Sequence, residues 1–456
     1  MTTETRPVEA RPLVTEPHPY IPLTPDDRTA MLATIGVAST DDLFTDIPTA
    51  FRNPDIDIPD ALTELELLDE MRTLAARNRT AAEYACFLGA GAYRHFRPSL
   101  IDPLVMRGEF LTSYTPYQPE VSQGTLQTIF EFQSLVCELT GMDVANAGMY
   151  DGASALAEAC LMACAVTGRH RIAVSERVHP NWLAVVKGYA HGRDIAVDVM
   201  PHPAPGATFV LTSEHACLAI AQPDFYGRMS LDAAGWGDAA HAAGALYVVA
   251  AEPISLGMYR PPSDYGADIV VAEGQSLGVS LSFGGPYVGL FACRNDYIRQ
   301  MPGRIVGRTA DLEGRTGYVL TLQTREQHIR RERATSNICT SQQLIALSAS
   351  MYLATLGPRG LRRVAELCYE KAHYLADRID ALPGFHVERD EPFFHEFVVR
   401  TQKPPSEINR ALIERNIIGG LDVSDAIHNR VLLCVTELNT RAEIDALVDA
   451  LAEVSR

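Results

Sequence analysis

The chain has 456 residues, of which 47% are hydrophobic and 21% charged, enough for about two to three domains with a sizeable core. Its formal net charge of −18 argues against nucleic acid and anionic membranes as partners. No apolar run approaches the roughly 18 residues of a membrane span, and the N-terminal stretch lacks the apolar segment of a secretory signal. The nine cysteines are scattered and odd in number, which is typical of reduced thiols in a cytoplasmic protein.

Residues 1–80 are predicted to form a disordered tail and a helical N-terminal arm. Thr24 suits the N-cap of a first helix, Pro25 its first position and Gly36 its end. A second, short helix is expected at 39–44. A third is expected at 59–78, where leucines and a methionine form an apolar stripe.

Residues 81–330 are predicted to form a large α/β domain. After two strong helices, short apolar runs alternate with amphipathic helices. This alternation indicates a mainly parallel sheet, covered on both faces and joined by right-handed crossovers. The expected helices lie at 124–141, 151–166, 179–190 and 231–244, and the expected strands at 171–175, 194–200, 216–223, 245–251, 267–273 and 287–293.

Residues 331–456 are predicted to form a small C-terminal α+β domain that follows a long helix at 341–357. Its expected strands lie at 385–390, 393–401 and 430–438, and its expected helices at 406–416 and 440–454. A helical arm, a large α/β domain and a small α+β domain together favour the type I pyridoxal-phosphate transferase (aspartate-aminotransferase-like) fold. A fold by itself does not give a function.

The block at 87–159 carries the most specific motifs. It contains TPYQPEVSQGTLQ at 115–127 and, further on, ELTGMDVANAGMYDGASA. In these motifs the chain resembles the P-protein family of the glycine cleavage system, and the resemblance extends from YIPLT to the C-terminus. The length matches the shorter, N-terminal subunit of the split form of that enzyme.

The resemblance implies decarboxylation of glycine and transfer of the aminomethyl group to the lipoyl arm of the H-protein. It also implies a homologous catalytic partner, P-protein subunit 2, which carries pyridoxal phosphate. A heterodimer that pairs again into a heterotetramer is expected, because type I active sites form where two chains meet.

Two positions in this chain depart from a pyridoxal-phosphate enzyme of this fold. Such an enzyme needs a lysine for the Schiff base and a carboxylate near the pyridine nitrogen. Ser276 stands at the expected lysine position and Ala250 at the expected aspartate position, although Glu252 lies two residues further on. The chain is therefore predicted to have no catalytic residue of its own and to bind no cofactor covalently.

The three lysines of the chain agree with this prediction. Lys187 falls inside a predicted helix, and Lys371 lies in the helical start of the small domain. With Lys403 these are all the lysines, so no lysine occurs between Lys187 and Lys371, where the turn after the strand at 267–273 lies. No zinc-ligand spacing, Walker A motif or Ser-His-Asp signature is present, and no metal is expected.

Two groups of residues are candidate sites. A Pro-broken loop rich in tyrosines is expected to line the channel where the lipoyl arm meets the cofactor, with Tyr93, His95, Tyr114, Tyr117 and Glu120 as its walls. The alternative is a surface loop whose tyrosines only pack.

The second group follows a run of arginines. It is expected to complete the cofactor's phosphate site on the partner chain, through Arg333, Thr335, Ser336 and Asn337. The alternative is an ion-paired hinge between the domains.

The turn at Asp151–Ser154 opens a helix where type I enzymes hold the cofactor phosphate. The alternative is an ordinary N-cap, because the Asp151 carboxylate would repel a phosphate. Two other functions also remain open for the whole chain. One is a self-sufficient type I pyridoxal-phosphate enzyme with an unusual lysine, and the other is a purely scaffolding or regulatory subunit.

Overall fold

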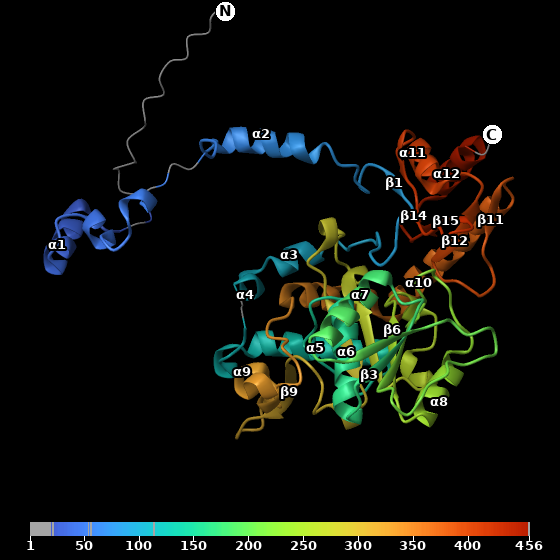
Figure 1. The fold of residues 1–456 in the computed structure, drawn as a ribbon, viewed down its shortest axis with the longest axis horizontal. Helices are drawn as coiled ribbons and strands as arrows, with labels where there is room; N and C mark the ends of the chain where they lie inside the picture. Colours follow the sequence, from blue (N-terminus) through green and yellow to red (C-terminus); the bar gives the residue numbers. More distant parts are fainter. Residues whose placement is uncertain (1–19, 21, 53, 55–56, 113–114, 455–456) are drawn as a thin grey trace, which may run out of the picture. The chain divides into compact units, whose positions relative to one another are not determined.

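The computed structural model describes residues 20, 22–52, 54, 57–112 and 115–454. It divides into two compact units, an N-terminal unit, Met1–Asn78, and a main unit, Arg79–Arg456 (Figure 1). The expected disordered tail at 1–19 lies outside the described residues. Among the described residues, no helix combines the length and the apolarity that crossing a membrane requires.

The N-terminal unit is helical, as the sequence predicts. Helix α1, Pro25–Ile35, begins at the N-cap Thr24 and ends at Gly36, whose φ of 88° places it in the left-handed region that favours glycine. Short 3₁₀ helices follow at η1, Thr40–Phe44, and η2, Thr49–Phe51. Helix α2, Glu64–Ala75, has a capping box between Thr63 and Glu66. None of the described residues of this unit is buried.

The main unit is built around a seven-stranded sheet with the strand order β2-β8-β7-β6-β5-β3-β4. Strands β4, β3, β5, β6 and β7 are parallel to one another. Strand β8 runs antiparallel to β7, and β2 runs antiparallel to β8. Six strands fall within the expected ranges, and the short β2 adds an edge. Their bounds are β2 Val144–Ala145, β3 Arg171–Ser175, β4 Ala196–Met200, β5 Cys217–Gln222, β6 Leu246–Ala251, β7 Ile269–Glu273 and β8 Gly289–Cys293.

Helices cover both faces of this sheet. Alternate residues of each strand point to opposite faces, so each face has an apolar core of its own. On strand β3, Ala173 packs into a core with helices α5, α8 and α10, whereas Ile172 and Val174 pack into a second core with α6 and α7. The helices are α5 Gln123–Thr140, α6 Gly152–Thr167, α7 Pro180–His191, α8 Ala233–Ala242 and α10 Gln343–Asp380. Figure 1 shows α6 and α7 stacked beside the sheet.

The segment between the sheet and α10 contains a hairpin that the sequence analysis does not predict. Strands β9, Ile305–Ala310, and β10, Thr316–Thr321, pair antiparallel and pack against α5 through a small core that includes Val306 and Leu126.

The remaining short helices of the main unit are α3 Ile101–Val105, α4 Gly108–Leu111, η3 Pro119–Val121, η4 Ser255–Gly257, η5 Pro262–Tyr265, η6 Gly274–Ser276, η7 Ser282–Gly284, η8 Asn295–Tyr297, η9 Gln323–Arg325, α9 Gln327–Arg330 and η10 Arg331–Arg333.

Helix α10 joins the large sheet to a second, four-stranded antiparallel sheet. It runs for 38 residues and is kinked at Gly357, where the sequence analysis places its end. The second sheet has the order β11-β12-β15-β14 and is covered by α11, α12 and the second half of α10. Its elements are β11 Phe385–Val387, β12 Glu396–Thr401, α11 Pro405–Ile413, β14 Leu421–Asp422, β15 Asn429–Cys434 and α12 Arg441–Val454, and β13 Ile417–Ile418 pairs with β1 Ala85–Cys86.

Candidate functional site

A cavity lies at the carboxyl ends of the parallel strands β5, β6 and β7. Side chains at this edge of a parallel sheet converge from neighbouring strands, which makes it the usual place for a ligand in α/β folds. The cavity has an empty volume of about 530 Å³, including its opening. Its walls are Gly91, Tyr93, His179, Trp182, Ala221, Pro223, Asp224, Phe225, Ala250, Ala251, Glu252, Pro253, Glu273 and Glu396.

The N-terminus of helix α6 contacts Glu273 of the cavity wall, and carboxylates of the chain itself bind the helix N-terminus. The Asp151 side chain accepts a hydrogen bond from the Ser154 amide at 2.7 Å, which completes a capping box. The Glu273 carboxylate accepts one from the Gly152 amide at 2.9 Å. The turn is therefore an N-cap of the ordinary kind, with a second acid added from the end of β7.

Burial raises the pKa of Glu273 to about 8, and the nearby Asp151 carboxylate raises it further. Three backbone amides, of Gly152, Gln275 and Val288, oppose this by donating to the carboxylate. Burial is the largest effect, so a substantial fraction of Glu273 is protonated near neutral pH.

The two positions singled out for missing catalytic groups both lie at this edge of the sheet. Ala250 is on β6, is 4% exposed and lines the cavity. Ser276 ends the short helix after β7 and is 1% exposed. Glu252 also lines the cavity, but its carboxylate binds the backbone amides of Ile254 and Ser255 at 3.1 and 2.6 Å.

Tyr93 and Glu396 form the wall opposite the sheet. The Tyr93 hydroxyl donates to the Glu396 carboxylate at 2.8 Å, and the Ala90 amide donates to it at 2.6 Å. Burial raises the pKa of Glu396 to about 7, and the Glu252 charge adds to this rise. Sequence reasoning missed Glu396, because it lies 303 positions from Tyr93.

His95 lies close to Tyr93, with 6.3 Å between their ring centroids, but it belongs to a different set of contacts. Its Nδ1 is 2.7 Å from a Glu437 oxygen, and the Cys368 thiol is 3.5 Å from the same oxygen. The ligand atoms of these three residues lie within 4.8 Å of one another, so they could hold a metal ion. The other Glu437 oxygen accepts from the Phe96 amide, so protein donors already satisfy this carboxylate.

The remaining members of the predicted channel are placed differently. The Tyr117 ring is 63% exposed and lies beside the Arg304 guanidinium, 5.5 Å from the ring centroid. Glu120 is exposed in the short helix η3. Tyr114 lies outside the described residues. The structure thus places Tyr93 in the cavity wall with His95 beside it, while Tyr117 and Glu120 lie on the surface near the hairpin.

The second predicted group, at 333–337, divides into exposed and buried members. The Arg333 side chain is 82% exposed and reaches Glu332 only at 3.9 Å, whereas Asn337 is exposed. Ser336 is 7% exposed, and its hydroxyl accepts from the Ile338 amide at 3.1 Å. The Thr335 carbonyl accepts from Arg193.

The alternative of an ion-paired hinge is only weakly supported. Arg330 donates to the Thr324 carbonyl and makes no ion pair with a described acid. Glu326 pairs instead with Arg304 at 3.8 Å and His328 at 3.5 Å. The exposed side chains of Arg333 and Asn337 therefore stay available for another molecule.

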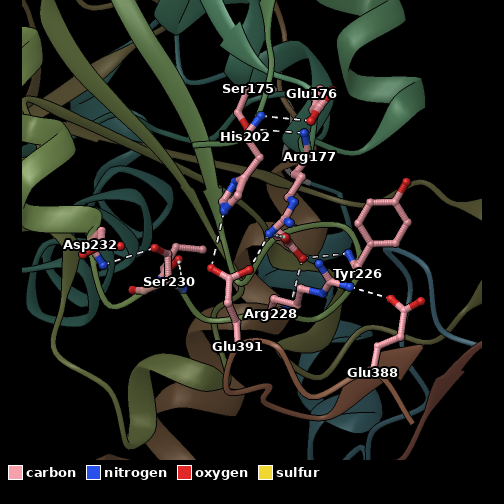
Figure 2. Close-up of polar contacts among 12 residues, drawn as sticks. Ser175, Glu176, Arg177, His202, Tyr226, Arg228, Ser230, Asp232, Glu388 and Glu391 are labelled. Atoms are coloured by element: carbon pink, nitrogen blue, oxygen red, sulfur yellow. Dashed lines mark hydrogen bonds and ion pairs between the residues drawn. The ribbon is translucent and has the colours of Figure 1, made fainter. Parts of the chain in front are cut away.

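A network of ion pairs beside the cavity was not predicted from the sequence. Figure 2 shows Arg177 and His202 both reaching Glu391, and Arg228 reaching Glu388. Glu391 and Glu388 precede β12, whereas the other three residues belong to the large-sheet region. Arg177 also lies 3.4 Å from Asp224, so it gives that wall of the cavity a cationic partner.

Comparisons with known proteins agree on one family. The family model described as "Glycine cleavage system P-protein" matches residues 18–451. The chain is 51% identical to a "Probable glycine dehydrogenase (decarboxylating) subunit 1" of Thermomicrobium roseum, over 96% of this chain and 99% of that relative. It is 50% identical to a relative of the same description from Desulfitobacterium hafniense, over 95% and 99%.

Solved structures give the same result for the fold. A crystal structure of glycine decarboxylase (P-protein) in inhibitor-bound form superposes with a TM-score of 0.88 and 45% identity, covering 95% of this chain and 99% of that one. Burkholderia pseudomallei sphingosine-1-phosphate lyase reaches 0.63 at 16% identity, covering 89% and 93%, and shows the fold alone. The predicted type I pyridoxal-phosphate fold is confirmed.

Proposed function

Because the chain belongs to the P-protein family of the glycine cleavage system, we propose that it is the subunit of a two-subunit glycine decarboxylase that binds no pyridoxal phosphate. With its catalytic partner, P-protein subunit 2, it forms an enzyme that decarboxylates glycine. The aminomethyl group passes to the lipoyl arm of the H-protein. The partner supplies the lysine and the cofactor.

The observation that carries this proposal is the chemistry of the cavity itself. A cofactor phosphate is dianionic and needs free amides at a helix N-terminus. In this chain Asp151 and Glu273 take the amides of Ser154 and Gly152 at the N-terminus of α6. These amides are no longer free for a phosphate, and the nearby Asp151 carboxylate repels one, so the residues present do not fit pyridoxal phosphate.

The other two requirements of the cofactor are also unmet. Ala250 offers no carboxylate to a pyridine nitrogen, and Ser276 offers no amine for a Schiff base. Lys371 donates to the Glu437 and Asn439 carbonyls. These contacts weigh against the alternative of a self-sufficient enzyme with an unusual lysine.

The N-terminal unit carries an apolar helix face that it does not cover by itself. Its described residues bury no side chain, yet α2 carries exposed apolar residues on a helix that also has well-formed caps. Apolar faces of this size are usually covered by another protein surface. The exposed apolar side chains of this helix are Leu65, Leu67, Leu68, Met71 and Leu74.

Both predicted groups of site residues remain part of the proposal. We place Tyr117 and Glu120 with Tyr93, His95 and Tyr114 in the lipoyl channel that the two subunits share. The exposure of the Tyr117 ring supports this role, because an aromatic face open to solvent can take an apolar arm.

We assign the residues that follow the hairpin a role in binding the partner's cofactor. We propose that Arg333, Thr335, Ser336 and Asn337 complete its phosphate site in trans, with Ser336 shaping the segment from inside. Arg333 and Asn337 are exposed, which leaves their donors free to reach another chain.

Reconstitution tests the proposal. The chain alone is expected to decarboxylate no glycine and to give no phosphopyridoxyl-lysine after borohydride reduction in the presence of pyridoxal phosphate. Mixed with subunit 2 and lipoylated H-protein, it is expected to restore glycine-dependent release of carbon dioxide. Activity of subunit 2 that is unchanged by adding this chain would contradict the proposal.

A double variant tests the alternative of a self-sufficient enzyme, and Tyr117→Ala tests the alternative of a purely scaffolding subunit. Replacing Ala250 with Asp and Ser276 with Lys restores both missing groups but leaves Asp151 and Glu273 in place. We expect this double variant to gain no aldimine absorbance, because Asp151 and Glu273 still take the helix amides that a phosphate needs. A purely scaffolding subunit would instead support normal turnover after Tyr117→Ala.

A further inference from the structure

Glu158 is the one charged residue of helix α6, and it is buried. The helix is otherwise rich in alanine, leucine, methionine and cysteine, and Glu158 is 4% exposed among them. Burial raises the pKa of its carboxyl to about 7. An acid inside an apolar helix face is costly, so the contacts that it makes there need an explanation.

The contacts of Glu158 lead to the segment that follows the hairpin β9–β10. The Ser336 hydroxyl hydrogen-bonds the Glu158 carboxyl, and the Arg193 guanidinium lies near enough to lower its pKa. Arg193 in turn donates to the Thr335 carbonyl at 3.1 Å. Two consecutive residues of the segment are therefore attached to α6 and to the loop after α7.

Burial alternates along this segment. Ser336 and Ile338 are 7% and 8% exposed, whereas Asn337 and Cys339 are exposed. Alternation with a period of two is typical of an extended chain, in which successive side chains point in opposite directions. Ile338 packs into the core that α6 and α7 share, so the inward side chains fix which of their neighbours face outward.

The polar contact sets the position of the segment more narrowly than the apolar one. The packing of Ile338 is not directional, so it tolerates small displacements along the chain. The hydrogen bond between Ser336 and Glu158 requires a fixed distance and direction. The Ser336 hydroxyl also accepts from the Ile338 amide at 3.1 Å, so the same group orients the backbone on both sides of Asn337.

We propose that Glu158 is a positioning residue: through Ser336 it holds Asn337 where that side chain reaches the phosphate of the partner's cofactor. The inference rests on the proposed function, in which the segment completes the partner's phosphate site. It adds a residue that touches neither the cofactor nor the partner chain. Glu158 is buried within its own subunit, so it acts through the segment.

Substitutions at Glu158 separate the hydrogen bond from the space that the side chain fills. Glu158→Gln keeps an acceptor for Ser336 in a side chain of the same shape, and a substantial fraction of the carboxyl is already neutral near pH 7. Glu158→Ala removes the acceptor. Ser336→Ala removes the same hydrogen bond from the other side, and it replaces Glu158→Ala in each test if that variant does not fold. Glu138→Ala, at an exposed acid of α5, is the control.

Hydrogen exchange of the isolated full-length chain measures whether Glu158 holds the segment. The Ile338 amide donates to the Ser336 hydroxyl, so its exchange reports release of the segment. Glu158→Ala is expected to speed this exchange about tenfold or more. Glu158→Gln and Glu138→Ala are expected to leave it close to that of the unmodified chain. Unchanged exchange in Glu158→Ala would overturn the inference.

Cofactor retention in the assembled complex measures the consequence for the partner. Glu158→Ala is expected to weaken pyridoxal-phosphate binding by subunit 2 roughly tenfold or more, as the loss of one charge-assisted hydrogen bond would. Glu158→Gln is expected to restore most of the affinity. In a double-mutant cycle with Asn337→Ala, the double variant is expected to bind the cofactor no more weakly than the weaker single variant, since both changes remove the same contact.

The outcomes separate this inference from the proposed function. If the unmodified chain restores glycine decarboxylation by subunit 2 and Glu158→Ala retains the cofactor equally well, the inference is overturned and the proposed function stands. If the unmodified chain has no effect on subunit 2, both fail. Additive losses in the cycle would show that Glu158 acts on stability alone and would also overturn the inference. A non-additive loss that glutamine restores supports it.

Discussion

The Glu273 carboxylate accepts a hydrogen bond from the Gly152 amide, with 2.9 Å between the oxygen and the nitrogen. Glu273 ends strand β7, and Gly152 is the first residue of helix α6. The contact therefore joins the sheet edge to the helix N-terminus, at the place where type I enzymes hold a phosphate. An acid of the chain thus binds a backbone amide at this helix N-terminus.

The elevated pKa of Glu273 predicts a loss of stability at alkaline pH. The carboxyl has its ordinary pKa of 4.5 in the unfolded chain and about 8 in the folded chain. The folded state thus binds the proton more tightly, so its contribution to stability is complete below pH 4.5 and is lost as pH rises through about 8.

Glu273→Gln removes this titration while keeping an acceptor oxygen for the Gly152 amide. Between pH 5 and 8.5, we expect the free energy of unfolding of the variant to fall by about 4 kcal/mol less than that of the unmodified chain. Urea unfolding at several pH values measures the difference. Glu313→Gln serves as the exposed control, and parallel pH curves for all three proteins would refute the buried titration.

Gly152 is predicted to be the least replaceable residue of helix α6. A Cβ at this position would lie 2.4 Å from the Trp182 ring and 3.0 Å from the Glu273 amide nitrogen. Overpacking of this kind costs about 1–3 kcal/mol. We therefore expect Gly152→Ala to lower the free energy of unfolding by that amount.

Gly188 provides the matched control for this substitution. It lies in helix α7, and a Cβ there has no heavy atom within 4 Å. Alanine in a helix interior is favoured over glycine by roughly 0.8–1 kcal/mol, so Gly188→Ala is expected to stabilise the chain. Denaturant unfolding that gives both variants the same sign would disprove the packing argument.

The trans role of the segment at 335–337 predicts weaker cofactor retention by the partner. Charge-assisted hydrogen bonds to a phosphate are worth about 1.5–3 kcal/mol each, and 1.4 kcal/mol corresponds to a factor of ten. We expect Thr335→Ala or Asn337→Ala to weaken pyridoxal-phosphate binding in the assembled complex roughly tenfold or more. Absorbance during dialysis of the complex measures this.

Ser336→Ala separates a local folding effect from a direct contact. The Ser336 hydroxyl accepts from the Ile338 amide inside the chain, so its loss is expected to lower stability in the isolated subunit as well. Asn337 is exposed, and its replacement is expected to leave that stability unchanged. Cofactor affinity equal to that of the unmodified complex in the Asn337 variant would rule out the shared site.

The channel assignment predicts a specific loss for Tyr117→Ala. The ring is 63% exposed beside Arg304, so its removal is expected to cost less than about 1 kcal/mol of stability. In the assembled complex we expect slower turnover and a higher KM for the H-protein. Tyr117→Phe keeps the aromatic face and is expected to restore most of the activity. Normal kinetics in an intact alanine variant would leave the loop with a packing role only.

The sequence by itself determined the order of the elements in this protein. Apolar runs such as 245–251 and 267–273 form strands β6 and β7, because a strand covered on both faces must be apolar along its whole length. The capping residues Thr24 and Gly36 bound helix α1 as predicted, since caps act within a few residues. The motifs at 115–127 were specific enough to identify the family.

The hairpin β9–β10 escaped prediction because its pattern is weak. Its strands alternate partly buried and exposed residues and contain glycines and arginines, which are typical of loops as much as of edge strands. Its stability comes from contacts with α5, on which Gln123 hydrogen-bonds the Tyr318 backbone across 195 positions. Local sequence cannot report such a contact.

Only the tertiary structure decided the character of the cavity. The sequence showed that Ala250 and Ser276 lack the groups that pyridoxal phosphate needs, because those positions follow recognisable strands. It could not show that Glu273 turns toward Gly152, or that Glu396 meets Tyr93 from 303 positions away. These acids become neighbours only when the sheet, the helix N-terminus and strand β12 pack together, and the burial that follows is what raises their pKa values.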